Sequence, residues 1–165
     1  MKDNKSISKI CLLGPKLVGK TSLANYKLTK QFNPDQIATV GIDIVSESVI
    51  IEGKKYVFKI YDTAGQERFD SVSSSTMKVS DGFILVFSVD KKETLNKIEK
   101  WINDIKENTH IDKKALILIG NKIDVDKREV TLKEGEEMAK KYNMKYFETS
   151  AKEGDGIDEA FQFIY

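Results

Sequence analysis

The stretch Gly14-Pro15-Lys16-Leu17-Val18-Gly19-Lys20-Thr21 decides the fold of this chain. It fits the pattern G-x-x-x-x-G-K-[ST], which cradles phosphate groups where it joins a strand to a helix. The apolar residues 7–13 before it predict a strand, and residues 19–28 predict a helix. Backbone N–H groups of the loop and the positive end of the helix would then bind phosphates. Lys20 is expected to reach the β- and γ-phosphates, and the Thr21 hydroxyl to ligate Mg²⁺. The stretch predicts a nucleoside triphosphate without identifying the base.

Outward from this stretch, apolar runs alternate with amphipathic ones. Residues 42–51 and 54–62 predict two strands of a hairpin around Glu52-Gly53. The continuous apolar runs 82–88 and 115–121 are typical of parallel strands buried on both faces. The remaining expected elements are a helix over 92–108 with Leu95, Ile98, Trp101, Ile102 and Ile105 on one face, a helix from the capping box Thr131-Leu132-Lys133-Glu134 to Tyr142, a short strand over 145–149 and a helix after Gly156. This alternation predicts a doubly wound α/β fold with ligands at the carboxyl ends of the strands.

The composition is that of one globular domain. The 165 residues are 40% hydrophobic and 32% charged, so we expect a single domain over residues 1–165. The net charge of +1 favours neither a nucleic-acid partner nor an anionic membrane surface. The single cysteine, Cys11, excludes an internal disulfide and suits a reducing compartment. A signal-peptide pattern is absent and the longest apolar runs are too short for a bilayer, so the sequence predicts a cytoplasmic protein.

A second motif identifies the base. Asn121-Lys122-Ile123-Asp124 directly follows a predicted buried strand. A carboxylate facing the edge of the base accepts hydrogen bonds from both N1–H and the exocyclic amine of guanine, whereas adenine presents no such pair of donors. An isolated N-x-x-D is a common turn at the end of a strand. Together with the phosphate loop that begins 107 residues upstream, it predicts guanine specificity.

A third motif, Asp62-Thr63-Ala64-Gly65-Gln66-Glu67, ends another predicted strand. Asp62 could hold Mg²⁺ through water, and the Gly65 N–H could contact a γ-phosphate. Gln66 carries both an acceptor and donors, which suits the positioning of an attacking water. A polar loop would explain an Asp and a Gly but not the whole ordered set.

These motifs, with Thr39 and Glu148-Thr149-Ser150-Ala151-Lys152, resemble a small GTPase of the Ras superfamily over essentially the whole chain. The resemblance implies a P-loop G domain with a six-stranded sheet, five strands parallel and one antiparallel, and five helices. It implies that Thr39 ligates Mg²⁺ and contacts the γ-phosphate, and that Phe32 lies against the guanine. It also implies that the Ala151 N–H binds guanine O6 and that the stem of Lys122 covers the base.

The expected site residues fall into three sets. The nucleotide-binding set is Gly14, Pro15, Lys16, Leu17, Val18, Gly19, Lys20, Thr21, Ser22, Phe32, Thr39, Gly65, Asn121, Lys122, Asp124, Ser150, Ala151 and Lys152. The catalytic set is Gln66, Lys20 and Thr39, and the metal set is Thr21, Thr39 and Asp62. The resemblance implies a switch that binds GTP or GDP with Mg²⁺, slowly hydrolyses GTP and regulates vesicle traffic or signalling.

The branch within the superfamily stays open at this point. Residues 62–69 and 39–43 are similar to the Rab branch, whereas residues 76–78 and 82–88 are closer to Ras proper. The positions of an aromatic triad that Rab proteins present to effectors hold Ile44, Tyr61 and Thr76. Expected partners are effectors, an exchange factor and a GTPase-activating protein, all acting through the two switches. We expect membrane attachment only through a lipidated tail, which residues 1–165 do not contain.

The phosphate loop departs from the family pattern, since Lys16 and Leu17 stand where small residues are usual. Lys16 would project near the γ-phosphate and Gln66, which leaves a hydrolysis-deficient guanine-nucleotide scaffold as an alternative function. A P-loop kinase or ATPase is a third hypothesis. The motif at residues 121–124 argues against it.

Overall fold

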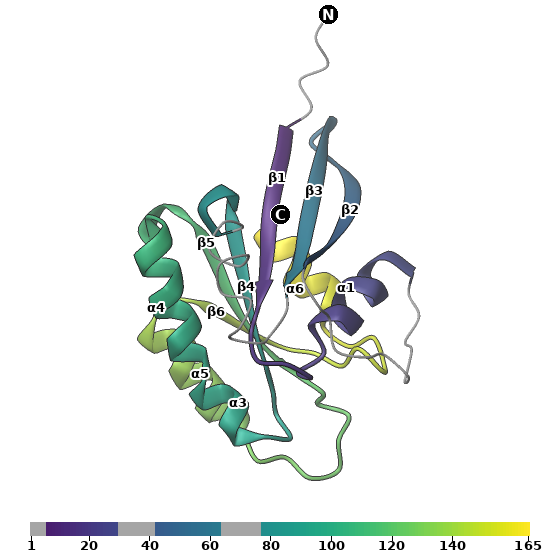
Figure 1. Cartoon of the computed structure of the whole chain (residues 1–165). Coiled ribbons are helices and arrows are strands. Elements are labelled where there is room, and N and C mark those ends of the chain that lie inside the picture. The colour runs from purple at the N-terminus through teal and green to yellow at the C-terminus, as the bar shows by residue number, and fades with distance from the viewer. Residues whose placement is uncertain (1–5, 30–41, 64–76) are drawn as a thin grey trace, which may run out of the picture.

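The structure, a computed structural model of the chain, describes residues 6–29, 42–63 and 77–165. One sheet of six strands runs through the molecule in the order β2-β3-β1-β4-β5-β6 (Figure 1). The strands are β1 (Ser6–Leu13), β2 (Ile42–Ile51), β3 (Lys54–Thr63), β4 (Gly82–Ser88), β5 (Ala115–Asn121) and β6 (Lys145–Glu148). The described α-helices are α1 (Lys20–Thr29), α3 (Lys92–Asn96), α4 (Ile98–Asn108), α5 (Leu132–Lys141) and α6 (Ile157–Ile164), with a short 3₁₀ turn, η2, at Ile111–Lys113.

The pairing of the strands confirms the fold implied by the sequence. β1 runs parallel to both β3 and β4, and β5 continues the parallel order to β6. Among the strands that the structure describes, only β2 is antiparallel, and it pairs with β3 around Glu52-Gly53. Both turn residues have positive φ, 49° for Glu52 and 77° for Gly53, as a two-residue hairpin turn of type I′ requires.

Two apolar layers cover the sheet. On one face, Phe83, Leu85 and Phe87 of β4 pack with the buried residues of α3, α4 and α5. On the other face, Ile84 and Val86 of the same strand pack with α1 and α6. Figure 1 shows α3, α4 and α5 on one side of the sheet and α6 with α1 on the other. The continuous apolar run of β4 is therefore explained by burial on both faces, as predicted.

The helix predicted over residues 92–108 is divided, and the prediction of one continuous helix was wrong. α3 ends at Asn96 and α4 begins at Ile98, with Lys97 between them at ψ −12°. That ψ tightens the turn, and the Lys100 N–H donates to the Lys97 carbonyl three residues back. The apolar face survives this junction, since the five residues predicted to share it are all buried: Leu95, Ile98, Trp101, Ile102 and Ile105.

The predicted capping box agrees with the structure, since the Thr131 hydroxyl caps α5 by accepting the Glu134 N–H at 3.2 Å. Cys11 is fully buried in β1, and His110 is exposed beyond the end of α4. Among the described residues, no helix is both long and apolar enough to cross a membrane.

Candidate nucleotide-binding site

The described motif residues gather at the carboxyl-terminal edge of the parallel strands. The phosphate loop leaves β1 at Leu13, the second motif begins on the last residue of β5, and residues 149–156 follow β6 (Figure 1). Asn121 pairs with Ser88 at the end of β4, and Gly120 pairs with Glu148. Parallel strands bring their carboxyl ends to one edge, which is where ligands bind in open α/β sheets.

The phosphate loop takes a shape that three residues with positive φ support: Gly14 at 149°, Leu17 at 63° and Gly19 at 99°. Space is tight at both glycines. A Cβ on Gly14 would lie 2.2 Å from the Val86 carbonyl oxygen, and one on Gly19 would lie 2.3 Å from Asn121 Nδ2. Leu17 adopts the left-handed conformation with its side chain 60% exposed, and the neighbouring Lys16 is also exposed.

Lys20 opens α1 and folds back over the loop. Its side chain is 5% exposed, and Nζ donates to the carbonyl oxygens of Gly14 at 3.0 Å and Pro15 at 2.8 Å. The ammonium is thereby held at the positive end of α1, within the curve of the loop. Thr21, which is partly buried, follows in the first turn of the helix. A buried cation, a helix N-terminus and a hard hydroxyl oxygen are together a donor set that fits Mg²⁺ and phosphate.

The second motif is fastened to the phosphate loop. Asn121, 1% exposed, donates from Nδ2 to the Val18 carbonyl at 2.9 Å and accepts from the Thr149 hydroxyl at 2.9 Å. Lys122 Nζ donates to the Leu17 carbonyl at 2.8 Å. The Asn121 side chain therefore connects the three loops of the candidate site, and Lys122 makes a second contact with the phosphate loop, so side chains fix the spacing between that loop and the second motif.

Asp124 is exposed and oriented. Its Oδ1 accepts from the Ser150 hydroxyl at 2.7 Å, and the same hydroxyl accepts from the Glu153 N–H at 3.0 Å. Ser150 is fully buried, so it is a fixed donor for the carboxylate. This is the arrangement that a carboxylate needs in order to present acceptors to the edge of a base.

The loop after β6 is shaped by contacts that sequence reasoning missed. The Ser150 N–H donates to the Asp155 carbonyl and the Gly154 N–H to the Ser150 carbonyl. A Cβ on Gly154 would lie 2.2 Å from the Tyr26 hydroxyl oxygen, so this loop lies directly against α1. The available signal in the sequence was the pair Gly154 and Gly156, because glycines permit the positive φ that both adopt in this turn.

Comparison with known proteins identifies the family. A model described as the Ras family matches residues 9–165. The chain belongs to the Ras family. Ras-related protein Rab-18 of Lymnaea stagnalis is 39% identical over 154 residues, 93% of this chain and 76% of that protein. Ras-related protein SEC4 of Saccharomyces cerevisiae is 39% identical over 160 residues, 97% and 74% of the two chains. Ras-related protein Rab-13 of Rattus norvegicus is 38% identical over 157 residues, 94% and 77%.

These comparisons confirm the resemblance inferred from the motifs, and the Rab-named relatives make this a Rab-like member of the Ras family. Several predicted site residues of the Ras-family chain are not tested by the structure. Phe32, Thr39, Gly65 and Gln66 lie outside the described residues, as does Thr76, one of the three positions of the Rab aromatic triad. Asp62 is described by its backbone, which pairs with Leu12 near the end of β3. The complete metal set therefore stays a prediction, as do the catalytic roles.

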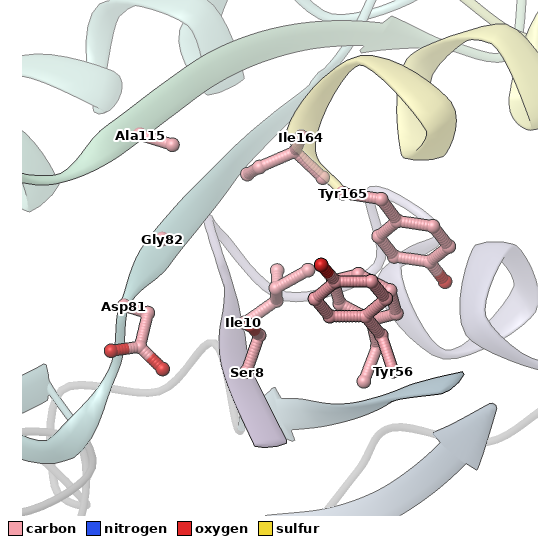
Figure 2. Close-up of a pocket in the computed structure, with 9 residues that line it drawn as sticks. Ser8, Ile10, Tyr56, Asp81, Gly82, Ala115, Ile164 and Tyr165 are labelled. Atoms are coloured by element: carbon pink, nitrogen blue, oxygen red, sulfur yellow. The ribbon is translucent and has the colours of Figure 1, made fainter. Parts of the chain in front are cut away.

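A pocket of about 290 Å³ lies at the opposite edge of the sheet. Figure 2 shows it between the first residues of β4 and β5, the start of β1 and the end of the chain after α6. It is lined by Ser8, Ile10, Tyr56, Phe58, Asp81, Gly82, Ala115, Ile164 and Tyr165. None of the described motif residues of this Ras-family member lines it, so this pocket is separate from the candidate nucleotide-binding site.

Proposed function

We propose that this protein is a guanine-nucleotide-dependent switch that binds GTP and GDP with Mg²⁺ and slowly hydrolyses GTP to GDP. One observation carries the proposal. The Asn121 side chain connects the phosphate loop at Val18 to Thr149, which would hold a phosphate subsite and a base subsite at a fixed spacing.

Guanine specificity is supported by the hydrogen bond between Asp124 and Ser150. The 2.7 Å hydrogen bond from the buried Ser150 hydroxyl leaves the Asp124 carboxylate at the surface of the site. Guanine offers N1–H and an amine as paired donors, and adenine would leave the carboxylate unpaired. A desolvated, unpaired group of this kind gives discrimination of ~10⁴-fold or more. Ala151 is 4% exposed in the same loop, where its N–H is proposed to meet guanine O6.

At the phosphate end, Lys20 and the loop N–H groups are proposed to hold the β- and γ-phosphates, with Val18, Gly19 and Ser22 in the same segment. Thr21, Thr39 and Asp62 would hold Mg²⁺, which supplies neutralisation of the charge between the β- and γ-phosphates. Lys20 is already placed over the loop by the carbonyl oxygens of Gly14 and Pro15, so a phosphate would exchange these contacts for stronger charge-assisted ones.

The switch itself is proposed from the family. Thr39 and Gly65 would contact the γ-phosphate and order the two switch segments, and Gln66 would orient the attacking water. Loss of the γ-phosphate would release both segments, and effectors, an exchange factor and an activating protein would read that difference. The Rab-named relatives favour a role in vesicle traffic over other signalling.

The alternative is a guanine-nucleotide scaffold that does not hydrolyse GTP. The observation that favours it is the exposed Lys16 beside Leu17, which adopts a left-handed backbone conformation in the phosphate loop. Nucleotide binding survives either way, because backbone N–H groups hold phosphates whatever the side chains are.

One experiment tests both functions. Nucleotide is released from the purified protein, identified by chromatography, and replaced by GTP, ATP or XTP in competition; cleavage of bound GTP is then followed in a single turnover with and without Mg²⁺. The switch predicts bound guanine nucleotide and slow, Mg²⁺-dependent cleavage. Binding without cleavage supports the scaffold, and equal affinity for ATP and GTP contradicts both.

A further inference from the structure

A partly buried hydrogen-bonded network lies two residues before Ser150, which holds Asp124. Glu148, the last residue of β6, accepts from both terminal nitrogens of Arg128, at 3.0 Å for the Oε1 contact. Glu148 Oε2 also accepts from the Tyr146 hydroxyl at 2.8 Å. Burial and this hydrogen bond to a carboxylate both raise the pKa of Tyr146, so the hydroxyl remains a donor at neutral pH. The bond to Glu148 likewise raises the pKa of Arg128.

Tyr146 is wedged where only glycine leaves room. A Cβ on Gly120 would lie 2.4 Å from the Tyr146 hydroxyl oxygen, and one on Gly135 of α5 would lie 2.3 Å from its ring. Phe87 stacks on the ring at 6.1 Å between centroids. The hydroxyl therefore lies over the backbone of Gly120, the residue before Asn121, and its direction is set by packing on three sides.

Residues 148–150 are hydrogen-bonded at two points to the loop that carries Asp124. Glu148 holds Arg128, and Ser150, two residues further on, holds Asp124. Arg128 also donates from Nε to the Val130 carbonyl at 3.0 Å, which closes the far end of the same loop. A displacement of residues 148–150 would thus shift both hydrogen-bonding partners, Glu148 and Ser150, and would move Asp124 with them.

We propose that Tyr146 is a positioning residue for guanine recognition: its hydroxyl fixes Glu148, so that Arg128 and Ser150 hold Asp124 in line with the donors of the base. The inference rests on the guanine binding proposed above. Tyr146 does not touch the nucleotide. It therefore acts only through the position of the Asp124 carboxylate, on the hydrogen bonds that Asp124 makes with the base.

The test compares release of GDP with release of IDP, whose base lacks the exocyclic amine. Tyr146→Phe removes the hydroxyl and leaves the ring between Gly120 and Gly135. We expect GDP release about three- to tenfold faster, since a hydrogen bond to a charged group is lost and part of its effect reaches the site. Release of IDP should change less, because IDP makes only the N1–H contact with Asp124, so the ratio of the IDP to the GDP release rate should fall.

Tyr142→Phe is the matched control. Tyr142, directly after α5, is also hydrogen-bonded to a carboxylate, that of Glu99 in α4. The ammonium groups of Lys106 and Lys141 lie over its ring. Its loss should leave both release rates unchanged. In an Arg128→Ala background, Tyr146→Phe should add less than it does in the native protein, because both act through Glu148. Compared with Arg128→Ala, the conservative variant Arg128→Lys should release GDP more slowly, because a lysine can still pair with Glu148.

The outcomes separate the inference from the function on which it rests. If the unmutated protein released GDP and IDP at equal rates, the proposed contact between Asp124 and the guanine amine would itself be contradicted. With native discrimination intact, an unchanged ratio in Tyr146→Phe would overturn the positioning role. So would an equal acceleration of both nucleotides with a matching loss of thermal stability, which is the pattern of a merely structural residue.

Discussion

Asn121 Nδ2 lies 2.9 Å from the carbonyl oxygen of Val18, across 103 residues of chain. The oxygen of this amide also accepts a hydrogen bond from the Thr149 hydroxyl, so one buried side chain connects the phosphate loop to the loops that follow β5 and β6. The place that a Cβ on Gly19 would take is 2.3 Å from the same Nδ2 atom. A side chain at position 19 would therefore displace the Asn121 amide.

Gly19→Ala should lower the affinity for GTP and GDP by about tenfold or more. The added methyl displaces the Asn121 amide, and φ of 99° is strained for any residue with a side chain, at a cost of about 1–3 kcal/mol. Fluorescent-nucleotide titration measures the change. Gly53→Ala is the matched control: it also has a positive φ, but a Cβ there meets nothing within 4 Å. It should lower thermal stability and leave affinity intact; equal affinity losses in both variants would refute the Asn121 explanation.

Asp124→Asn should change the preferred base. An amide replaces a double acceptor with one acceptor and one donor, which suits xanthine, whose carbonyl replaces the guanine amine. Competition binding with GTP, XTP and ATP should show the preference moving from GTP to XTP. A variant that still favours GTP over XTP would show that Asp124 does not read the base.

Leu17→Gly should stabilise the protein. A non-glycine residue in the left-handed region costs about 1–2 kcal/mol, and φ at Leu17 is 63° with the side chain largely exposed. Glycine loses this strain but adds entropy to the unfolded chain, which offsets about 0.5–1 kcal/mol. We expect a small rise in melting temperature for the nucleotide-free protein. A clear fall would mean that the Leu17 side chain makes a stabilising contact.

Lys16→Gly, tested with Leu17→Gly since the loop has positive φ there, should raise GTP turnover stimulated by an activating protein. The long side chain would occupy space needed by the attacking water, Gln66 and an incoming arginine finger. That finger is worth roughly 10³–10⁵ in rate, so relief of the obstruction should give about tenfold or more, on the order of 1.4 kcal/mol. If intrinsic cleavage becomes slower instead, Lys16 stabilises the developing phosphate charge and the steric explanation is wrong.

Periodicity and motif spacing predicted the elements well where burial dictates the residues. The run Gly82–Ser88 is buried throughout, and the apolar face of residues 92–108 was identified correctly even though Lys97 divides the helix. The division itself depends on the backbone angles of one lysine, which has no distinctive sequence signal.

The site was predictable in its motifs and less so in its supports. Lys20, Asn121 and Asp124 are recognisable because their chemistry follows from pattern and spacing. The hydrogen bonds of Tyr146 and Arg128 to Glu148 depend on how β6 lies beside β5 and on the path of the loop before α5. Such contacts come from sheet register, which the linear sequence does not display. Thr39 and Phe32 were assigned only through the family.

The two-residue turn at Glu52-Gly53 has a consequence for how this chain assembles. β2 and β3 pair with partners at most 21 residues apart, from Ile42 with Thr63 to Ile51 with Lys54. The central strand β1 must find β3 across 50 residues and β4 across 72. Loop-closure entropy penalises the distant pairings more, and a hairpin closes in about 1–10 μs. We expect this hairpin to be present early as a template, with insertion of β1 between it and β4 as the slow step of folding.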